Sequence, residues 1–430
     1  MSEPLKVAIA GLGTVGAGTV ALLRRNAGQI EHHTGRKIEV VAVSARDRAR
    51  SRTIDINGVP WHDDAVAMAG APGIDVVVEL IGGSDGVAKR VVTTALEHGR
   101  HVVTANKALL AHHGNEIAHL AESKRISLGF EAAVAGGIPI LKALREGLAA
   151  NHVLRVCGIL NGTCNYILSQ MRETGRDFAA VLKEAQALGY AEADPSFDID
   201  GIDAAHKLAL LAAVAFGTQV DFAGVHVEGI RHITALDIAF AHDLGYRIKL
   251  LGLARPTEAG LEQRVHPCMV PLAAPLAHVE NVFNAVMVEG DFVGRLTLEG
   301  RGAGADPTAS AVVADLLDIA AGRGAPGFGV PASLLQRRPS APMARRSGAY
   351  YVRLMVVDRP GVIADITAAF RDEAVSMEQF LQRGRSPGEA VPVVLTTHDT
   401  VEASMLRALG RIAGLDTVVE PPCMIRVENL

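Results

Sequence analysis

The densest group of charged residues in the chain lies between residues 189 and 207. Asp203 and Lys207 are four residues apart at the start of an apolar run beginning at Leu208, so they share one face of an expected helix. A lysine partly buried beside carboxylates is a common proton donor or acceptor, and carboxylates can hold a substrate ammonium group. The same spacing also fits a simple helix ion pair, and the acids before it also fit caps and turns. The acids of this block are Glu192, Asp194, Asp198, Asp200 and Asp203.

A second lysine, Lys107, follows the short apolar run at residues 101–104. If that run is a parallel strand, Lys107 lies at its carboxyl end, where open α/β sheets bind their ligands. Glu79 and Gly82 lie at the end of the preceding apolar run, residues 74–80. Each of these residues taken alone also fits an ordinary loop.

A glycine-rich loop follows the first apolar run, residues 7–10, and precedes a stretch with helical spacing. A G-x-G-x-x-G motif in this position predicts a dinucleotide site, because its glycines permit a tight turn, close approach to a pyrophosphate and close packing of the helix. The helix N-terminus would then face the phosphates. The loop residues are Gly11, Leu12, Gly13, Thr14, Val15 and Gly16.

The end of the second expected strand, residues 38–43, bears on which nicotinamide cofactor is used. An acidic residue there usually binds the ribose 2′-hydroxyl of NAD, but this chain has Arg46 followed by Asp47. An arginine there can bind a 2′-phosphate, which favours NADP over NAD. A solvated surface arginine paired with Asp47 is the alternative.

The elements that would position these residues alternate short β-branched runs with helical stretches over the first 110 residues. This order is typical of βαβ units in a doubly wound, Rossmann-type parallel sheet. Asp306 and Pro307 predict an N-cap and first residue of a helix reaching about residue 320. Residues 322–348 have the irregular composition of a linker, and the last 80 residues predict a βαββαβ unit.

The composition excludes several classes of protein. Hydrophobic residues make up 49% and charged residues 21% of the 430 residues, which is typical of a globular chain. With 42 Lys and Arg against 47 Asp and Glu, the chain has no basic excess for nucleic acid or an anionic membrane. The four cysteines form no CxxC pair, and the amino-terminal residues do not resemble a secretory signal. We therefore expect a reduced, soluble, cytoplasmic protein.

Several motifs together resemble the homoserine dehydrogenase family. They lie in order along the chain, at residues 11–16, 79–83, 104–109, 158–167, 189–207 and 302–312. The carboxy-terminal unit, with Asp358, Pro360 and Gly361 in its first turn, resembles an ACT domain. The resemblance implies an α/β fold with an NAD(P)-binding Rossmann domain (1–130 plus a returning helix, 306–321), an α+β catalytic and dimerisation domain (131–305), a linker (322–348) and an ACT domain (349–430).

The resemblance also implies a reaction and roles for particular residues. The family reversibly reduces L-aspartate 4-semialdehyde to L-homoserine with NADPH or NADH, on the route to threonine, methionine and isoleucine. By position, Glu192 and Asp203 would bind the substrate with support from Asp198. Lys207 would donate the proton, and Lys107 would lie between substrate and nicotinamide. The expected cofactor-binding residues are Gly11, Leu12, Gly13, Thr14, Val15, Gly16, Arg46, Gly82, Lys107, Gly189 and Gly304.

The family further implies a structural sodium ion bound by backbone carbonyls, at positions that match Glu131, Val134, Gly136 and Ile138. It implies a homodimer or homotetramer, and an amino-acid effector, most plausibly threonine, at the ACT domain. The expected linker would keep that domain off the catalytic core, so the domain would not be needed to assemble the active site. Two alternatives remain at this point. One is a dehydrogenase acting on a 2-hydroxy acid, which would use a histidine such as His206. The other is a sensor that binds nucleotide and amino acid without turnover.

Overall fold

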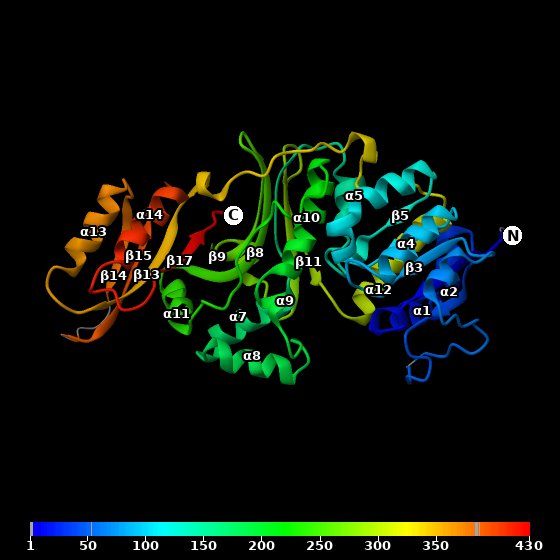
Figure 1. Cartoon of the computed structure of the whole chain (residues 1–430), viewed down its shortest axis with the longest axis horizontal. Coiled ribbons are helices and arrows are strands. Elements are labelled where there is room, and N and C mark those ends of the chain that lie inside the picture. The colour runs from blue at the N-terminus through cyan, green and yellow to red at the C-terminus, as the bar shows by residue number, and fades with distance from the viewer. Residues whose placement is uncertain (1–2, 53, 383–385, 387) are drawn as a thin grey trace.

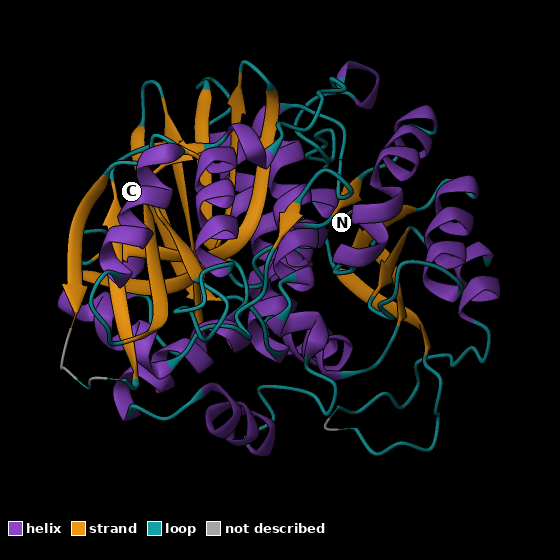
Figure 2. Cartoon of the chain, turned by 60° about the vertical axis from the view of Figure 1, so that its left-hand side comes forward, coloured by secondary structure: helices purple, strands orange, loops and turns teal. Residues whose placement is uncertain are grey.

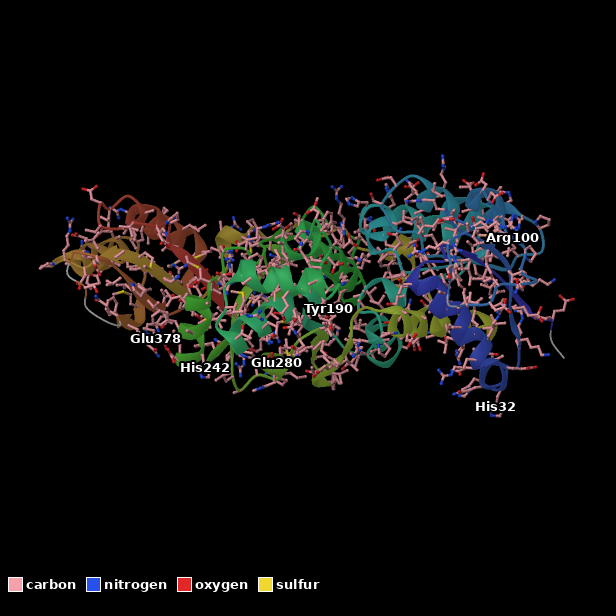
Figure 3. All side chains as sticks on the ribbon, turned by 90° about the horizontal axis from the view of Figure 1, so that it is seen from below. His32, Arg100, Tyr190, His242, Glu280 and Glu378 are labelled. Carbon is pink, nitrogen blue, oxygen red and sulfur yellow. The ribbon has the colours of Figure 1, made fainter. Side chains whose placement is uncertain are left out.

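The computed structural model describes residues 3–52, 54–382, 386 and 388–430. The molecule is elongated, with the amino-terminal unit at one end, a sheet-rich middle unit, and the carboxy-terminal unit at the other end (Figure 1). In the same order along the molecule, Figure 3 shows His32 and Arg100 at one end, Tyr190 in the middle and Glu378 at the other end. Among the helices of the described residues, none combines the length and apolar character needed to cross a membrane.

The amino-terminal unit is built on a parallel sheet with strand order β2-β1-β3-β4-β5. Its strands are β1 (Leu5–Ala10), β2 (Ile38–Ser44), β3 (Val76–Glu79), β4 (His101–Thr104) and β5 (Leu128–Gly129). Its helices are α1 (Thr14–Arg25), α2 (Ala27–Thr34), α3 (Ala65–Gly70), α4 (Val87–Glu97), α5 (Lys107–Ser123) and the returning α12 (Ala305–Ala320).

Alternation along β1 shows why helices cover both faces of this sheet. Val7 and Ile9 belong to one buried cluster, with residues of α1 and α12, whereas Ala8 and Ala10 belong to another, with residues of α4 and α5. Successive strand residues point to opposite faces, so a strand that is apolar throughout must be covered twice. The predicted doubly wound fold is thereby confirmed.

The middle unit packs helices against a mixed sheet (Figure 2). Its strands are β6 (Val153–Ile159), β7 (His226–Val227), β8 (Tyr246–Thr257), β9 (Gly260–Pro271), β10 (Phe283–Gly290) and β11 (Gly294–Arg301). Its helices are α6 (Ile140–Lys142), α7 (Gly162–Thr174), α8 (Phe178–Ala187), α9 (Ser196–Ile199), α10 (Ile202–Phe216) and α11 (Ala235–Asp243), with short turns η1 (Glu131–Ala133), η2 (Ala143–Gly147) and η3 (Pro275–His278). Helix α10 is buried along most of its length, as its apolar sequence requires.

The carboxy-terminal unit has the predicted βαββαβ order, with one added two-residue strand. Its elements are β13 (Tyr350–Val357), α13 (Val362–Asp372), β14 (Met377–Gln382), β15 (Ala390–Thr397), β16 (Thr400–Val401), α14 (Glu402–Ala413) and β17 (Cys423–Val427). Before it, residues 322–348 run along the middle unit (Figure 1) and form η4 (Ala332–Leu334), η5 (Met343–Arg345) and β12 (Ser347–Gly348).

The expectation that the carboxy-terminal unit is held away from the middle unit is wrong. Strand β17 pairs in parallel with β9, so one ten-stranded sheet runs through both units. Nine of its strands follow the order β11-β10-β6-β8-β9-β17-β13-β15-β14, and the tenth, β7, pairs with β9 beside this path. The expected linker also forms bridges to the middle unit, at Thr218–Gln336 and Leu261–Ser340. The irregular composition correctly indicated a loop. It gave no reason to expect that the loop would make no contact with the middle unit.

The predicted cap of α12 is also wrong, by two residues. The helix begins at Ala305 and its N-cap is Gly304, with φ +119°. Asp306 and Pro307 therefore lie in the first turn, where an acid interacts well with the helix dipole and a proline removes no helical hydrogen bond.

Candidate active site

The glycine loop joins β1 to α1 and forms part of the wall of a cavity. Gly11 has φ +107°, and a Cβ on it would lie 2.5 Å from the carbonyl oxygen of Leu80. A Cβ on Gly16 would lie 2.0 Å from the carbonyl oxygen of Gly11, whereas Gly13, the N-cap of α1, faces open space. The first and third glycines thus permit the turn and its packing, and the second leaves the backbone accessible.

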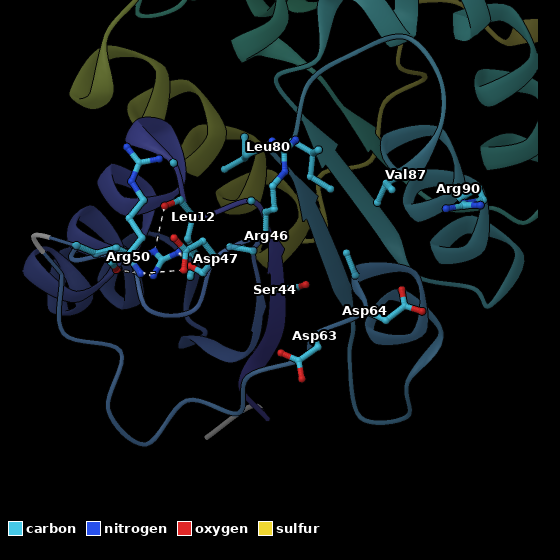
Figure 4. A pocket seen from close by; sticks show the side chains of 16 residues that line it. Leu12, Ser44, Arg46, Asp47, Arg50, Asp63, Asp64, Leu80, Val87 and Arg90 are labelled. Carbon is cyan, nitrogen blue, oxygen red and sulfur yellow. Dashed lines mark hydrogen bonds between the residues drawn. The ribbon is translucent and has the colours of Figure 1, made fainter.

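The cavity beside this loop has a volume of about 660 Å³ (Figure 4). It opens at the carboxyl ends of β1, β2 and β3, and the connections leave in opposite directions from β1 and β3, which is where doubly wound sheets bind ligands. Four arginines line it, of which sequence reasoning had selected only the first: Arg46, Arg50, Arg52 and Arg90. Gly82, Gly189 and Gly304 are not among its lining residues.

Arg52 fixes the loop that carries Arg46 and Arg50. Its guanidinium donates to the carbonyls of Leu12, at 3.3 Å, and Asp47, at 2.5 Å. It also lies 5.2 Å from the ring centre of Trp61. The Asp47 carboxylate is used within its own turn, because it accepts from the backbone N–H groups of Ala49 and Arg50. Asp47 therefore caps its own turn, as short acidic side chains commonly do.

The second polar cluster lies where α10 begins. Lys207 donates to Asp203 Oδ2 at 2.7 Å and to the carbonyl oxygen of Leu160 at 2.8 Å. Lys107, at the start of α5, contacts Asp203 Oδ1 at 3.0 Å. The two lysines therefore bind opposite oxygens of one carboxylate. The side chain of Lys107 is 32% exposed and that of Lys207 is 10% exposed, so Lys107 is the more accessible.

Asn161 joins Asp198 to this cluster. Its amide nitrogen donates to Asp198 Oδ1 and to Asp203 Oδ2, both at 2.8 Å, and its oxygen caps α7 by accepting from Cys164 N. Sequence reasoning gave Asn161 no role, although its position directly before a helix was the available signal. Glu192, in contrast, is exposed in the loop before α9, and within the described residues its carboxylate makes no hydrogen bond to this cluster.

The electrostatics of the cluster follow from burial and proximity. Burial opposes ionisation of Asp203, but the charges of Lys207 and Lys107 outweigh it and hold the pKa of Asp203 well below its usual value. Burial also opposes the charge on Lys107, yet Asp203 raises the pKa of this lysine above its ordinary range. Burial and the nearby charge of Asp203 raise the pKa of Asp198. The cluster thus contains an ionised carboxylate held between two ammonium groups.

His206 is turned away from Lys207 into an aromatic group. Its ring lies 4.3 Å from Phe222 and 5.5 Å from both Phe197 and His112, measured between ring centres. Burial lowers the pKa of His206 to about 4, and neither ring nitrogen has a hydrogen-bond partner among the described residues. A neutral histidine packed in this way does not fit the catalytic base required of a 2-hydroxy-acid dehydrogenase.

Glu79 connects the carboxyl ends of two neighbouring strands beside the cavity. Its buried carboxylate accepts from the backbone N–H groups of Ile81 and Gly82 and from the Thr104 hydroxyl, at 2.7, 3.2 and 2.7 Å. Asn106 then donates to the Gly83 carbonyl and caps α5, which begins with Lys107. The weak sequence signals at Glu79, Gly82 and Lys107 thus belong to one structure that orients Lys107.

Comparison with known proteins shows which family models and relatives the chain matches. Residues 139–317 match the family model described as homoserine dehydrogenase, residues 11–131 the model of the homoserine dehydrogenase NAD-binding domain, and residues 350–414 the ACT domain. The homoserine dehydrogenases of Neisseria gonorrhoeae and Pseudomonas aeruginosa are each 47% identical to this chain. Each alignment covers all of this chain, with 99% and 100% of the relative.

The chain belongs to the homoserine dehydrogenase family. A solved homoserine dehydrogenase from Thiobacillus denitrificans is 47% identical, with a TM-score of 0.93 over 99% of this chain and 98% of that one. A hyperthermophilic archaeal homoserine dehydrogenase solved in complex with NADPH is 25% identical, with a TM-score of 0.63 over 74% of this chain and 97% of that one. As a homoserine dehydrogenase, the chain is an NAD(P)-dependent oxidoreductase with a carboxy-terminal ACT domain.

Proposed function

We propose that Lys207 donates the proton in the reversible reduction of L-aspartate 4-semialdehyde to L-homoserine. The observation that carries this is the convergence of Lys207 and Lys107 on Asp203. Reduced nicotinamide supplies hydride to the aldehyde carbon, and negative charge develops on the aldehyde oxygen. Lys207 has two of its three N–H groups engaged by Asp203 and Leu160, which leaves one to donate to that oxygen. Lys107 would stabilise the same charge from the more open side.

The substrate ammonium group would be held by carboxylates. Asp198 and Asp203 already lie together through Asn161, and Glu192 would approach from its exposed loop when the substrate binds. Because the single charge of Asp203 is already shared by the two lysines, Asp198 beside it would add the negative charge that the ammonium group needs. The raised pKa of Asp198 implies that homoserine binding weakens as the pH falls toward that pKa.

Replacing Lys207 tests the assignment of the proton donor. Lys207→Met should lower kcat by about 10²- to 10⁴-fold, the usual range for a lost general acid. The Kd for NADPH should remain near that of the intact enzyme, because Lys207 is not among the residues that line the cavity beside the glycine loop. Steady-state homoserine oxidation and fluorescence titration with NADPH provide the two measurements. A variant with near-normal kcat would transfer the donor role to Lys107 or water.

The preferred cofactor is proposed to be NADP, with NAD as a weaker alternative. Arg46 lies in the cavity wall at the end of β2, with Arg50 in the same loop and Arg90 on the opposite side (Figure 4). These side chains match a 2′-phosphate in charge. Arg46→Asp should therefore reduce kcat/KM with NADP far more than with NAD. Arg48→Asp, a change of the same charge at a residue outside the cavity lining, is the control. Equal losses with both cofactors would contradict the preference.

A structural sodium ion is proposed in the loop that follows β5. Hard cations of this type prefer oxygen ligands. Among the described residues, the carbonyls of Val134 and Gly136 accept no hydrogen bond, and that of Glu131 accepts only a long one, at 3.5 Å, from Val134 N. The carbonyl of Ile138 accepts from Ile140 N at 2.8 Å and would have to be shared. Replacing sodium with choline should lower the Tm. An unchanged Tm would contradict the site.

The remaining proposals concern regulation, assembly and location. Threonine is proposed to bind the ACT domain. Calorimetry on the intact enzyme would test this, and absence of binding would contradict it.

A homodimer or homotetramer is proposed to form through the middle unit. Three apolar side chains there are exposed, Leu154, Phe292 and Val293, at 49%, 90% and 40%, and light scattering would test the oligomeric state. The four cysteines are free and buried, in keeping with a proposed cytoplasmic location. The predicted division at residues 1–130 with 306–321, 131–305, 322–348 and 349–430 also remains a proposal.

A further inference from the structure

Segment 226–231, which follows α10 and includes strand β7, lies between the Asp198–Asp203 cluster and the carboxy-terminal unit. Its backbone joins the ten-stranded sheet, because His226 and Val227 pair with Arg264 and Val265 of β9, and Glu228 N donates to the Val265 carbonyl at 2.8 Å. One end of the segment contacts the turn that carries Asp198, and the Glu228 side chain reaches the carboxy-terminal unit.

The contacts with the Asp198 turn are close and mainly made by backbone. Ile230 N donates to the Ile199 carbonyl at 2.9 Å. A Cβ on Gly229 would lie 2.3 Å from that carbonyl oxygen, so the segment touches the turn directly. Arg231 binds both oxygens of Asp200, at 2.5 and 3.0 Å, and donates to the Ser196 hydroxyl at 3.0 Å.

This turn has little of its own to hold it in place. Helix α9 has only four residues, from Ser196 to Ile199, and its N-cap Pro195 makes no side-chain capping bond. Gly201, the N-cap of α10, has φ +85° and no side chain with which to cap the helix. Asp194 Oδ1 accepts from Ser196 N at 3.1 Å, but a helical turn this short is unstable by itself even with one such bond. The position of Asp198, and of Asp203 in the first turn of α10, therefore depends on neighbouring segments.

On its other side, the segment is held by an ion pair between half-buried Glu228 and buried Arg426. Arg426 of β17 donates to Glu228 through two nitrogens, both at 2.8 Å, and to Glu402 of α14 at 2.9 and 2.5 Å. The residue Arg426 is 2% exposed. Burial opposes ionisation of Glu228, yet hydrogen bonds from His226 and Arg426 hold its pKa well below the usual value. A bidentate, charge-assisted pair of this kind fixes geometry as well as charge.

We propose that Glu228 and Arg426 are positioning residues for substrate binding: they hold segment 226–231, which holds the turn carrying Asp198 and the start of α10. The carboxy-terminal unit thereby forms part of the support of the substrate site. This inference rests on the proposed binding of the substrate by Asp198 and Asp203. Removing the Glu228 charge leaves the segment in place on β9 but weakens its hold on Arg426, because an amide offers one acceptor oxygen in place of two charged ones, so the turn gains freedom without losing any group that touches substrate.

The test compares KM values in variants of the full-length enzyme. Glu228→Gln should raise the KM for homoserine about 3- to 30-fold, the range for changes that act through a neighbouring segment. The KM for NADP should remain within about twofold, because the glycine-loop cavity does not include this segment. Arg231→Ala loosens the same turn from a half-exposed position, so it should raise the same KM even if Glu228→Gln does not fold. Tyr351→Phe, which removes a hydrogen bond to Asp237 across the same boundary, should leave both KM values unchanged.

The variants separate the positioning roles of Glu228 and Arg426 from the assignment of the substrate site to Asp198. If Asp198→Asn raises the KM for homoserine but Arg231→Ala and Glu228→Gln do not, the positioning roles are wrong. If Asp198→Asn leaves that KM unchanged, the substrate site itself is wrongly assigned. A rise with Tyr351→Phe as large as with Glu228→Gln would mean that the boundary acts only through overall stability, and would also overturn the proposal.

Discussion

At the boundary between the middle and carboxy-terminal units, each of three buried or half-buried carboxylates faces a guanidinium group. Arg264 contacts Glu428 at 2.6 Å, Arg426 contacts Glu228 at 2.8 Å and Arg353 contacts Asp237 at 2.7 Å. At the boundary with the amino-terminal unit, the buried carboxylates of Glu131 and Asp315 lie near each other instead. Asp315 of α12 accepts from Glu131 N. Among the described residues, the cations that contact these carboxylates lie farther away, with Lys142 3.7 Å from Asp315 and Arg145 3.9 Å from Glu131.

The pKa values at the two boundaries shift in opposite directions. Burial opposes the charge on Glu428, but Arg264 and Arg346 hold its pKa well below the usual value. Burial raises the pKa of Glu131 to about 7, and the charge of Asp315 adds to the shift. Burial likewise raises the pKa of Asp315. The first boundary is therefore stabilised by its charges near neutral pH, while the second carries an electrostatic cost. The two boundaries therefore differ at these carboxylates: those at the first are paired with guanidinium groups, whereas Glu131 and Asp315 are not closely paired, although Lys107 and Lys142 make ion pairs with Asp203 and Asp318 across the second boundary.

The largest expected effect comes from removing the carboxy-terminal unit. A chain ending at residue 345 would leave β9 without β17 and expose its buried residues Cys268 and Met269. We expect it to be insoluble, or to unfold about 10 °C or more below the intact enzyme, which corresponds to several kcal/mol. Thermal unfolding of the two purified chains is the measurement, with a chain ending at Glu428 as the control. A truncated enzyme with normal Tm and turnover would show that the continuous sheet contributes little.

Matched neutral substitutions at the two boundaries should have unequal effects. Glu428→Gln removes the carboxylate shared by the buried guanidinium groups of Arg264 and Arg346, which leaves Glu262 as the anionic partner of Arg264, and should cost up to about 3–5 kcal/mol at pH 7. Asp315→Asn keeps an oxygen to accept from Glu131 N while removing one of two neighbouring negative charges, so it should change stability by less than about 1 kcal/mol. Urea unfolding of both variants compares them directly. Equal losses of unfolding free energy in the two variants would contradict the difference in charge pairing between the boundaries.

The smallest expected effect is a dependence of stability on pH. Glu131 has a folded pKa of about 7 against an ordinary 4.5, so between these values the folded state binds more protons than the unfolded state. Its contribution to the unfolding free energy therefore decreases as pH rises from 5 to 8, by at most about 3 kcal/mol. Glu228 and Glu428 act oppositely, because their lowered pKa values contribute stability that is lost below about pH 4.5. Asp315→Asn should make the unfolding free energy fall less steeply as the pH rises above 5. If the variant and the intact enzyme show the same slope, this role of the Glu131–Asp315 pair is contradicted.

Sequence patterns predicted those features that depend on neighbours along the chain. The spacing of Asp203 and Lys207 predicted their contact. The alternation of β-branched runs with helical stretches predicted the parallel sheet, and the order of such runs predicted the βαββαβ unit. The position of Lys107 after β4 indicated a place at the ligand edge of the sheet, but not that it would contact the same carboxylate as Lys207. That contact depends on how the sheet packs against α10, which no local pattern contains.

The attachment of the carboxy-terminal unit was missed for a related reason. Glu228 and Arg426 are 198 residues apart, and in the sequence each is an ordinary charged residue. The pairing of β17 with β9 involves only two residue pairs, Arg426–Cys268 and Val427–Met269, too few to leave a distinctive pattern. The irregular composition of residues 322–348 described the connecting chain correctly but gave no information on what lies beside it.

The passage of one sheet through two units limits how this enzyme can be re-engineered. A carboxy-terminal unit from another protein, joined at residue 348, would bring its own last strand, and that strand would have to pair in parallel with β9. It would also have to present an arginine opposite Glu228 and a carboxylate opposite Arg264. Exchange of effector modules by joining linkers is therefore not available to this fold, and a working chimera must retain residues 423–428 or change β9 along with them.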